Sequence, residues 1–223
     1  FDLLLRIEVW QKHLSMDSSI AWSHLERILN EVYLNSNTDV NEMSEGPLIR
    51  TALYDEHVAL DGNIVDFHGF ELPIWYTSMM EEHLNTRENA GLFDVSHMGF
   101  FRFTGENVRE WMDGVGTQKA SAIPPGRCAY THFLDQEGLI IDDMIFCVVS
   151  ETEILGVPNA SMINHMWEHF HANIVEGITI ENLSDDTSIL ALQGPYAPQI
   201  LESILATENV ARHFHGQVIV END

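Results

Sequence analysis

Two adjacent carboxylates, Asp142 and Asp143, interrupt an otherwise apolar run of the chain. Successive side chains of an extended strand point to opposite faces, so one carboxylate can be solvated while the other projects into whatever pocket the sheet covers. Burial or a hydrogen bond would tune the second carboxylate for proton handling. The pattern alone leaves two interpretations open, a functional acid or a solvated pair at the end of a hairpin.

A second group, Asp94, Ser96 and His97, has the residue types of a hydrolase. Residues this close in sequence seldom reach the geometry of nucleophile, base and orienting group, and the chain has no Gly-x-Ser-x-Gly elbow. We therefore interpret Asp94 and Ser96 as groups that stabilise a turn.

Histidines offer a weak metal pattern. His165 and His169 lie one turn apart on a predicted helix, with His171 nearby, but no Glu lies between them as in a zincin. We expect a partly exposed helix face and no metal. His213 and His215 have the same interpretation.

Two other residue types need comment. Cys128 and Cys147 lack the paired spacing of a zinc or redox motif, so we expect small buried thiols, which suits a reducing compartment. Asn159 lies at a predicted strand-to-helix junction, where unspent backbone groups commonly bind ligands, although a simple turn role is equally compatible.

The elements that position these residues alternate from Thr51 onward without regular βαβ spacing, which predicts an α+β fold. Strands at 130–134 and 139–149 should form a hairpin whose loop uses Gly138 for a positive φ. Ser78 opens a capping box, and Gly91 would end that helix in the left-handed region. Further strands are predicted at 101–103, 153–157, 174–180 and 188–192, and further helices at 106–113, 161–172 and from Pro195.

The two ends of the chain differ from its middle. Residues 1–35 predict two short amphipathic helices, and a polar stretch follows to Pro47. We interpret residues 1–45 as a helical extension and linker, and the stretch that begins at Met43 has the character of a natural amino terminus. The last apolar run, Val218–Val220, ends in mid-strand, which leads us to expect a truncated chain.

Charge excludes one class of partner. The chain has 35 Asp plus Glu against 10 Lys plus Arg, a net charge of −25. Such a field repels polyanions, so we expect no nucleic acid, and an acidic surface that water and ions solvate. No window reaches the roughly 18 apolar residues of a membrane helix, so we expect no membrane span and a cytoplasmic protein, or a mitochondrial matrix one in a eukaryote.

Four segments resemble, in order and spacing, the glycine cleavage T-protein family of aminomethyltransferases: LYDEHVALDGNIVDFHGFELPIWY, EEHLNTRENAGLFDVSHMG, GRCAYTHFLDQEGLIIDDMI and ILALQGPYAPQIL. The resemblance implies a folate-binding fold with two sequence-interleaved α+β domains. Residues 46–98 and 185–223 would form the first domain and residues 99–184 the second, inserted one. The family's third domain, a C-terminal barrel, is absent from this sequence.

The resemblance also implies a site. Asp143, as the second aspartate of the IDD pair, would be the catalytic carboxylate near N5 and N10 of tetrahydrofolate, where it stabilises developing positive charge. Met98, Tyr130 and Asn159 would contact the folate. The implied reaction takes an aminomethyl group from the lipoyl carrier protein and releases ammonia and 5,10-methylenetetrahydrofolate. We expect a monomer.

Two departures from the family bear on activity. The family's pterin-binding Glu segment has no counterpart before Asp223, so this stretch alone should be inactive. Gly114 to Gln118 replaces a Thr-Asn-Asp-like stretch, which bears on substrate preference. Two alternatives share the fold: a tetrahydrofolate-dependent demethylase, and a non-enzymatic folate-binding protein of iron–sulfur assembly.

Overall fold

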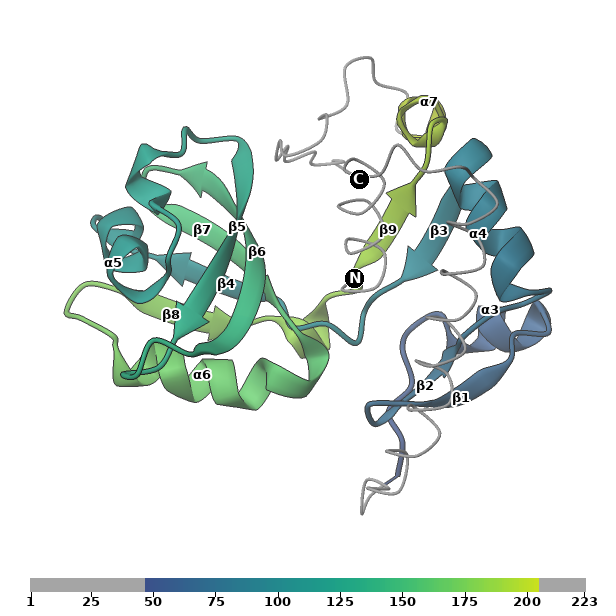
Figure 1. Ribbon diagram of the computed structural model, residues 1–223, viewed down its shortest axis with the longest axis horizontal. Helices are drawn as coiled ribbons and strands as arrows, with labels where there is room; N and C mark the ends of the chain where they lie inside the picture. Colours follow the sequence, from purple (N-terminus) through teal and green to yellow (C-terminus); the bar gives the residue numbers. More distant parts are fainter. Residues whose placement is uncertain (1–46, 205–223) are drawn as a thin grey trace. The chain divides into compact units, whose positions relative to one another are not determined.

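The structure is a computed structural model that describes residues 47–204 (Figure 1). The helices predicted before residue 36, the linker, His213, His215 and the final strand lie outside the described residues. Helices and strands alternate irregularly, which confirms the predicted α+β class. Their order is α3 (Tyr54–Ala59), β1 (Ile64–Phe67), β2 (Phe70–Pro73), α4 (Met79–Glu88), β3 (Gly91–Asp94), β4 (Phe101–Thr104), α5 (Val108–Val115), β5 (Arg127–Leu134), β6 (Ile140–Ser150), β7 (Glu153–Pro158), α6 (Ile163–Ala172), β8 (Thr179–Asn182), β9 (Leu190–Gln193) and α7 (Ala197–Ile204), with short 3₁₀ turns at Ala120–Ala122, Ala160–Met162 and Ser184–Asp186.

An antiparallel sheet forms the largest layer, with strand order β5-β6-β7-β4-β8. Helices α5 and α6 lie against one face of it (Figure 1), and alternate side chains of each strand turn toward them. Burying each large apolar side chain there contributes about 1.5–3 kcal/mol. The largest fully buried ones are Phe101, Phe103, Phe133, Phe146, Phe170, Met112, Met144, Ile154 and Met166.

The predicted hairpin is present as β5 and β6. In its loop the Asp135 carboxylate accepts hydrogen bonds from the backbone N–H groups of Glu137 and Leu139, at 3.0 and 2.8 Å. Gly138 has φ +81°, the left-handed conformation for which glycine was predicted here. The loop therefore closes on local interactions alone, which is why the sequence predicts it well.

A smaller sheet joins segments far apart in sequence. Strand β3 pairs antiparallel with β9, with Gly91 opposite Gln193. Residues on both sides of the stretch 99–184 thus meet in one hydrogen-bonded pair. The proposed domain limits, 46–98 with 185–223 and 99–184, stay a prediction.

Helix α4 begins as predicted and ends differently. The Ser78 hydroxyl accepts a hydrogen bond from the backbone N–H of Glu81 at 3.2 Å, which is the N-cap bond of a capping box. The C-terminal cap is Asn89, however, and Gly91 is already in β3, so the prediction that Gly91 is a left-handed cap is wrong. Glycine fits there because a Cβ would lie 2.4 Å from the Thr86 hydroxyl oxygen.

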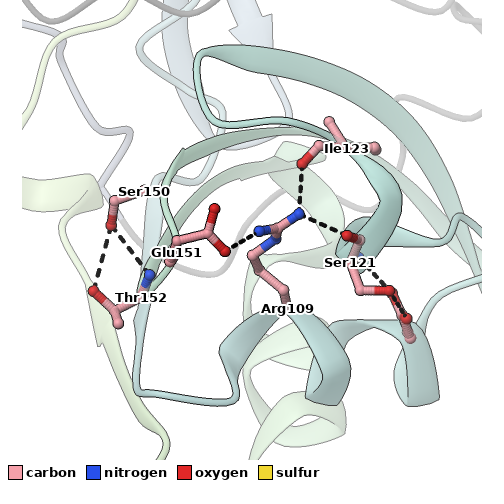
Figure 2. Close-up of polar contacts among 7 residues, drawn as sticks. Arg109, Ser121, Ile123, Ser150, Glu151 and Thr152 are labelled. Carbon is pink, nitrogen blue, oxygen red and sulfur yellow. Dashed lines mark hydrogen bonds and ion pairs between the residues drawn. The ribbon is translucent and has the colours of Figure 1, made fainter.

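One arginine fixes the stretch between α5 and β5. The Arg109 guanidinium donates to the carbonyl oxygens of Ser121 at 2.6 Å and Ile123 at 2.8 Å, and it pairs with Glu151 (Figure 2). The Ser121 backbone N–H in turn donates to Asp113 at 2.8 Å. Arg109 is one of only 10 Lys and Arg residues in the chain, and it holds this segment in place.

The two cysteines form a disulfide. Cys128 and Cys147 lie directly opposite each other on β5 and β6, with an S–S distance of 1.98 Å. The prediction of separate, reduced thiols is therefore wrong. Their spacing of 19 residues matches no motif, and only the register of the two strands brings them together.

No helix between residues 47 and 204 is long and apolar enough to cross a membrane.

Candidate functional site

The two adjacent carboxylates point to opposite faces of β6, as the strand period predicts. Asp142 lies on the face covered by α5 and α6 and is 7% exposed. Asp143 lies on the other face and is half-buried. The interpretation of a freely solvated pair is therefore wrong, and Asp143 is the one that points away from the helices.

Asn159 contacts both carboxylates. Its side-chain amide donates to Asp142 Oδ1 at 2.7 Å, to the Asp143 carbonyl oxygen at 3.1 Å and to Asp143 Oδ1 at 3.3 Å. Asn159 directly follows β7, which pairs with β6. Because the bond to Asp142 spans 17 residues, spacing along the chain gave no sign of it.

Burial raises the pKa of Asp142 above its usual value, because charge is disfavoured away from water. The hydrogen bond from Asn159 opposes this rise, since it favours the charged form. Asp142 Oδ2 is buried and has no hydrogen-bond partner among the described residues. A buried carboxylate with an unpaired oxygen lowers the stability of the fold. This cost suggests that Asp142 has a role of its own.

Tyr130 projects from the same face of the sheet as Asp143. It lies opposite Ile145, and Asp143 lies opposite His132 in the same pair of strands. Directly opposite residues share a face, as do residues two apart along a strand. A phenol and a carboxylate are thus presented together on the face that α5 and α6 leave uncovered. Their contact with folate stays a prediction.

Met98 directly precedes Gly99, which contacts the end of β7. The backbone N–H of Gly99 donates to the carbonyl oxygen of Pro158 at 3.0 Å, and Pro158 immediately precedes Asn159. A Cβ on Gly99 would lie 2.6 Å from the Pro158 ring, so glycine permits this approach. Met98 itself is buried. The segment before β4 is thereby fixed at the end of β7, the strand that pairs with β6. The contact of Met98 with folate stays a prediction.

Asp94 stabilises a turn, as predicted, and also does more. Its Oδ1 accepts from the Ser96 backbone N–H at 3.0 Å, while its Oδ2 contacts His57 Nε2 at 2.9 Å and the Thr51 hydroxyl at 2.6 Å. Tyr76 Oη lies 2.8 Å from His57 Nδ1. Burial pushes the pKa of Asp94 upward, but these hydrogen bonds outweigh it and lower the pKa.

Sequence reasoning missed the roles of His57 and Tyr76. They come from α3 and from the stretch between β2 and α4, and they line one side of a cavity of about 490 Å³ together with Asp94. No spacing rule connects residues that are 37 and 19 positions apart. The buried His–Asp pair ties the first described helix to β3.

His97 lies in an environment that disfavours its charged form. Burial lowers its pKa from 6.5 to about 4. Its ring lies edge-on to Phe67 and Phe70, with centroids 5.2 and 6.2 Å away. It therefore belongs to an aromatic cluster and lacks the nucleophile and base partners of a hydrolase.

The described part of the chain contains no group of three or more His, Cys, Asp or Glu side chains arranged to hold a metal ion. His169 packs its ring near Phe133 and Phe170, with centroids 5.9 Å from each. Burial lowers its pKa, as expected for an imidazole in an apolar setting.

Fold and site together define an α+β domain that presents a carboxylate and a phenol from the open face of an antiparallel sheet. A family model described as the GCVT N-terminal domain matches residues 53–218. The chain belongs to this family, that of the glycine cleavage T-protein.

Individual relatives agree. An aminomethyltransferase of Thermotoga petrophila is 37% identical over 175 residues, which are 77% of this chain and 48% of that protein. One from Deinococcus deserti is 37% identical over 164 residues, 73% of this chain and 46% of that protein. The crystal structure of glycine cleavage system aminomethyltransferase T from Bartonella henselae superposes with a TM-score of 0.68 at 26% identity, covering 73% of this chain and 45% of that one. The chain spans about half the length of the curated relatives it matches.

Proposed function

We propose that this chain provides the folate-facing catalytic carboxylate of a tetrahydrofolate-dependent aminomethyltransferase of the glycine cleavage system. Family membership and the names of the relatives support transferase chemistry of this kind. The observation that carries the assignment to residues is the placement of Asp143 and Tyr130 on the same face of the β5–β6 hairpin, the face that α5 and α6 leave uncovered.

The proposed reaction transfers one carbon between two carriers. The lipoyl carrier protein supplies it as an aminomethyl group on a sulfur of its dihydrolipoyl arm. Two bonds form, from the carbon to N5 and N10 of tetrahydrofolate, and the bonds to sulfur and to the amine nitrogen break. The two protons lost from N5 and N10 end on the released thiol and ammonia, so the reaction needs no oxidant.

Asp143 has the properties that this transfer requires. Positive charge develops on the carbon while it is bonded to nitrogen, and a fixed carboxylate stabilises such charge most where water is partly excluded. Asp143 is half-buried and hydrogen-bonded by Asn159, so its carboxylate is both shielded and held. Tyr130, on the same face, offers a hydroxyl and a ring against which a pterin can pack.

Replacing Asp143 by Asn removes the charge at nearly constant shape. In a chain that also contains the family's pterin-binding segment, we expect the fold to persist and the rate of methylenetetrahydrofolate formation to fall by about 100-fold or more. The matched control is Asp186→Asn, at an exposed aspartate, which should leave the rate unchanged. Asp142→Asn should cost less than Asp143→Asn. Near-normal activity of Asp143→Asn would refute the assignment.

Product analysis separates this function from its relatives. Aminomethyl transfer yields ammonia and 5,10-methylenetetrahydrofolate, whereas demethylation of a methylated substrate yields 5-methyltetrahydrofolate. For a chain that also contains the family's pterin-binding segment, formation of the 5-methyl product would overturn the proposal. Folate binding without turnover in the presence of aminomethylated carrier protein would overturn it too.

A further inference from the structure

A single amide group is shared by three oxygen atoms of the two aspartates. The side-chain nitrogen of Asn159 carries two hydrogens, while three acceptors lie within 3.3 Å of it. The shortest distance, 2.7 Å, is to Asp142, and those to Asp143 are 3.1 Å and 3.3 Å. One hydrogen therefore points to Asp142, and the other lies between two oxygens of Asp143.

The backbone of Asn159 is fixed on both sides. Its own carbonyl oxygen accepts from Met162 N–H at 2.9 Å, and the preceding carbonyl, of Pro158, accepts from Gly99 N–H at 3.0 Å. Pro158 lies opposite Met144 in the β6–β7 ladder. Because the backbone is held in this way, the side-chain amide of Asn159 can point in few other directions. Its two N–H groups donate to oxygens of the two aspartates.

Asp142 is a carboxylate on the apolar side of β6. It occupies a core position that Met144, Phe146 and Val148 share, where an apolar residue would fit the pattern. One of its oxygens is buried without a hydrogen-bond partner among the described residues, which costs stability. Its one strong side-chain contact is the amide of Asn159.

We propose that Asn159 is a positioning residue that orients the carboxylate of Asp143, and that Asp142 is the buried anchor that orients Asn159. This inference rests on the proposed function, because it assigns to Asp143 the reacting carboxylate. It replaces direct folate binding as the role of Asn159. An anchored amide limits the rotation of Asp143 and so keeps its oxygens where charge develops.

Steady-state kinetics distinguish positioning from binding. The kinetic variants are made in a chain that also contains the family's pterin-binding segment. For Asn159→Ala we expect kcat to fall by about 10- to 100-fold while KM for tetrahydrofolate stays within about threefold, since only the geometry of Asp143 changes. Asn164→Ala, at an exposed asparagine on α6, is the matched control and should behave as wild type. A raised KM with unchanged kcat would show that Asn159 binds folate directly and would overturn the proposal.

A double-mutant cycle tests the anchor. Asp142→Ala should lower kcat about as much as Asn159→Ala, and the double variant should be no more than about threefold slower than Asn159→Ala alone, because both act through one contact. Asp142→Asn keeps an acceptor oxygen and should lose less. Multiplied effects would mean independent roles and would reject the anchor. Circular dichroism verifies folding, and Asp142→Asn replaces Asp142→Ala in the cycle if the alanine variant unfolds.

One measurement is independent of catalysis. The pKa of Asp142, followed by carboxyl ¹³C NMR, should rise in Asn159→Ala, because the variant loses a hydrogen bond that favours the charged form while burial remains. An unchanged titration would refute the contact even if the protein transfers aminomethyl groups. Conversely, an upward shift in a chain that also contains the family's pterin-binding segment, yet shows no turnover with tetrahydrofolate, would support the contact and reject the proposed function.

Discussion

Asp94 collects hydrogen bonds from residues that lie far before it and just after it in sequence. His57 and Thr51 contact one carboxylate oxygen and Ser96 the other. A carboxylate whose pKa is lower in the folded state than in the unfolded state stabilises the fold at pH values above its unfolded pKa, about 3.9. This contribution is lost as the pH falls through the folded pKa. Asp94 thus contributes to acid sensitivity only at strongly acidic pH.

His97 gives the fold a pH dependence in a higher range. Its folded pKa of about 4 lies below the unfolded 6.5, so between these values the unfolded state binds the extra proton. Stability should therefore rise with pH from about 4 to 6.5 and then level off. Urea unfolding midpoints of wild type and His97→Phe, measured across this range, test this, and the variant should show a shallower rise.

The control for that experiment lies in the same aromatic cluster. Phe70→Leu weakens packing against His97 without removing a titrating group, so it should lower the midpoint at every pH by a similar amount. An equally steep pH dependence in wild type and His97→Phe would show that another group causes it.

At the scale of elements, the register of β6 against β5 determines which aspartate is buried against the helices and which points to the other face. Because side chains alternate along β6, a slip of one residue against β5 would exchange Asp142 and Asp143 between the two faces. The β5–β6 pairing is irregular between Phe133 and Leu134, just beyond the positions of the two aspartates. The buried side chains of β6 therefore set the direction of Asp143 as much as its own chemistry does.

Gly194, just before α7, allows the chain to pass close to the end of α4. Gly194 has φ +114°, and a Cβ there would lie 2.6 Å from the backbone oxygens of Asn89 and Thr86. We expect Gly194→Ala to destabilise the protein by about 2–4 kcal/mol, because backbone atoms cannot move aside cheaply. Thermal unfolding should then occur roughly 5–10 °C lower.

Gly114 is the matched control. It lies exposed within α5, and a Cβ added at this position would have no atom within 4 Å. Gly114→Ala should stabilise by about 0.5–1 kcal/mol, since alanine loses less entropy in a helix. Equal melting temperatures for the two variants would contradict the contact of Gly194 with the end of α4.

For the whole molecule, net charge is the dominant feature. A charge of −25 on 223 residues repels itself in the compact state. Salt shortens the Debye length from about 10 Å at 0.1 M to about 3 Å at 1 M. We expect the melting temperature at neutral pH to rise by about 5 °C or more over this range, measured by calorimetry.

The same salt series near the isoelectric point is the control. At pH close to 4.5 the opposing charges nearly cancel, so the rise should be much smaller. A rise of the same size at both pH values would indicate a solvation effect of salt instead of screening.

The sequence determined much of the local structure. Apolar alternation predicted β4 to β7 and most of β9, Gly138 predicted the hairpin loop and Ser78 the start of α4, because each depends on neighbours a few residues away. The strand predicted at 174–180 begins only at Thr179, and β1, β2 and β3 were not predicted. Four motif blocks also sufficed to indicate the family, which the comparisons confirm. Gly91 was predicted wrongly, because its role depends on a contact with the Thr86 hydroxyl that its own position in the sequence does not show.

Only the tertiary structure decided which distant groups meet. It joined Cys128 to Cys147, placed His57 on Asp94, and put one amide between two aspartates that the sequence shows only as neighbours. Strand register and helix packing are set by burial summed over the whole core, so no short stretch of sequence carries them. The chemistry of the carboxylate pair could thus be suspected from residue types, whereas its geometry required the folded sheet.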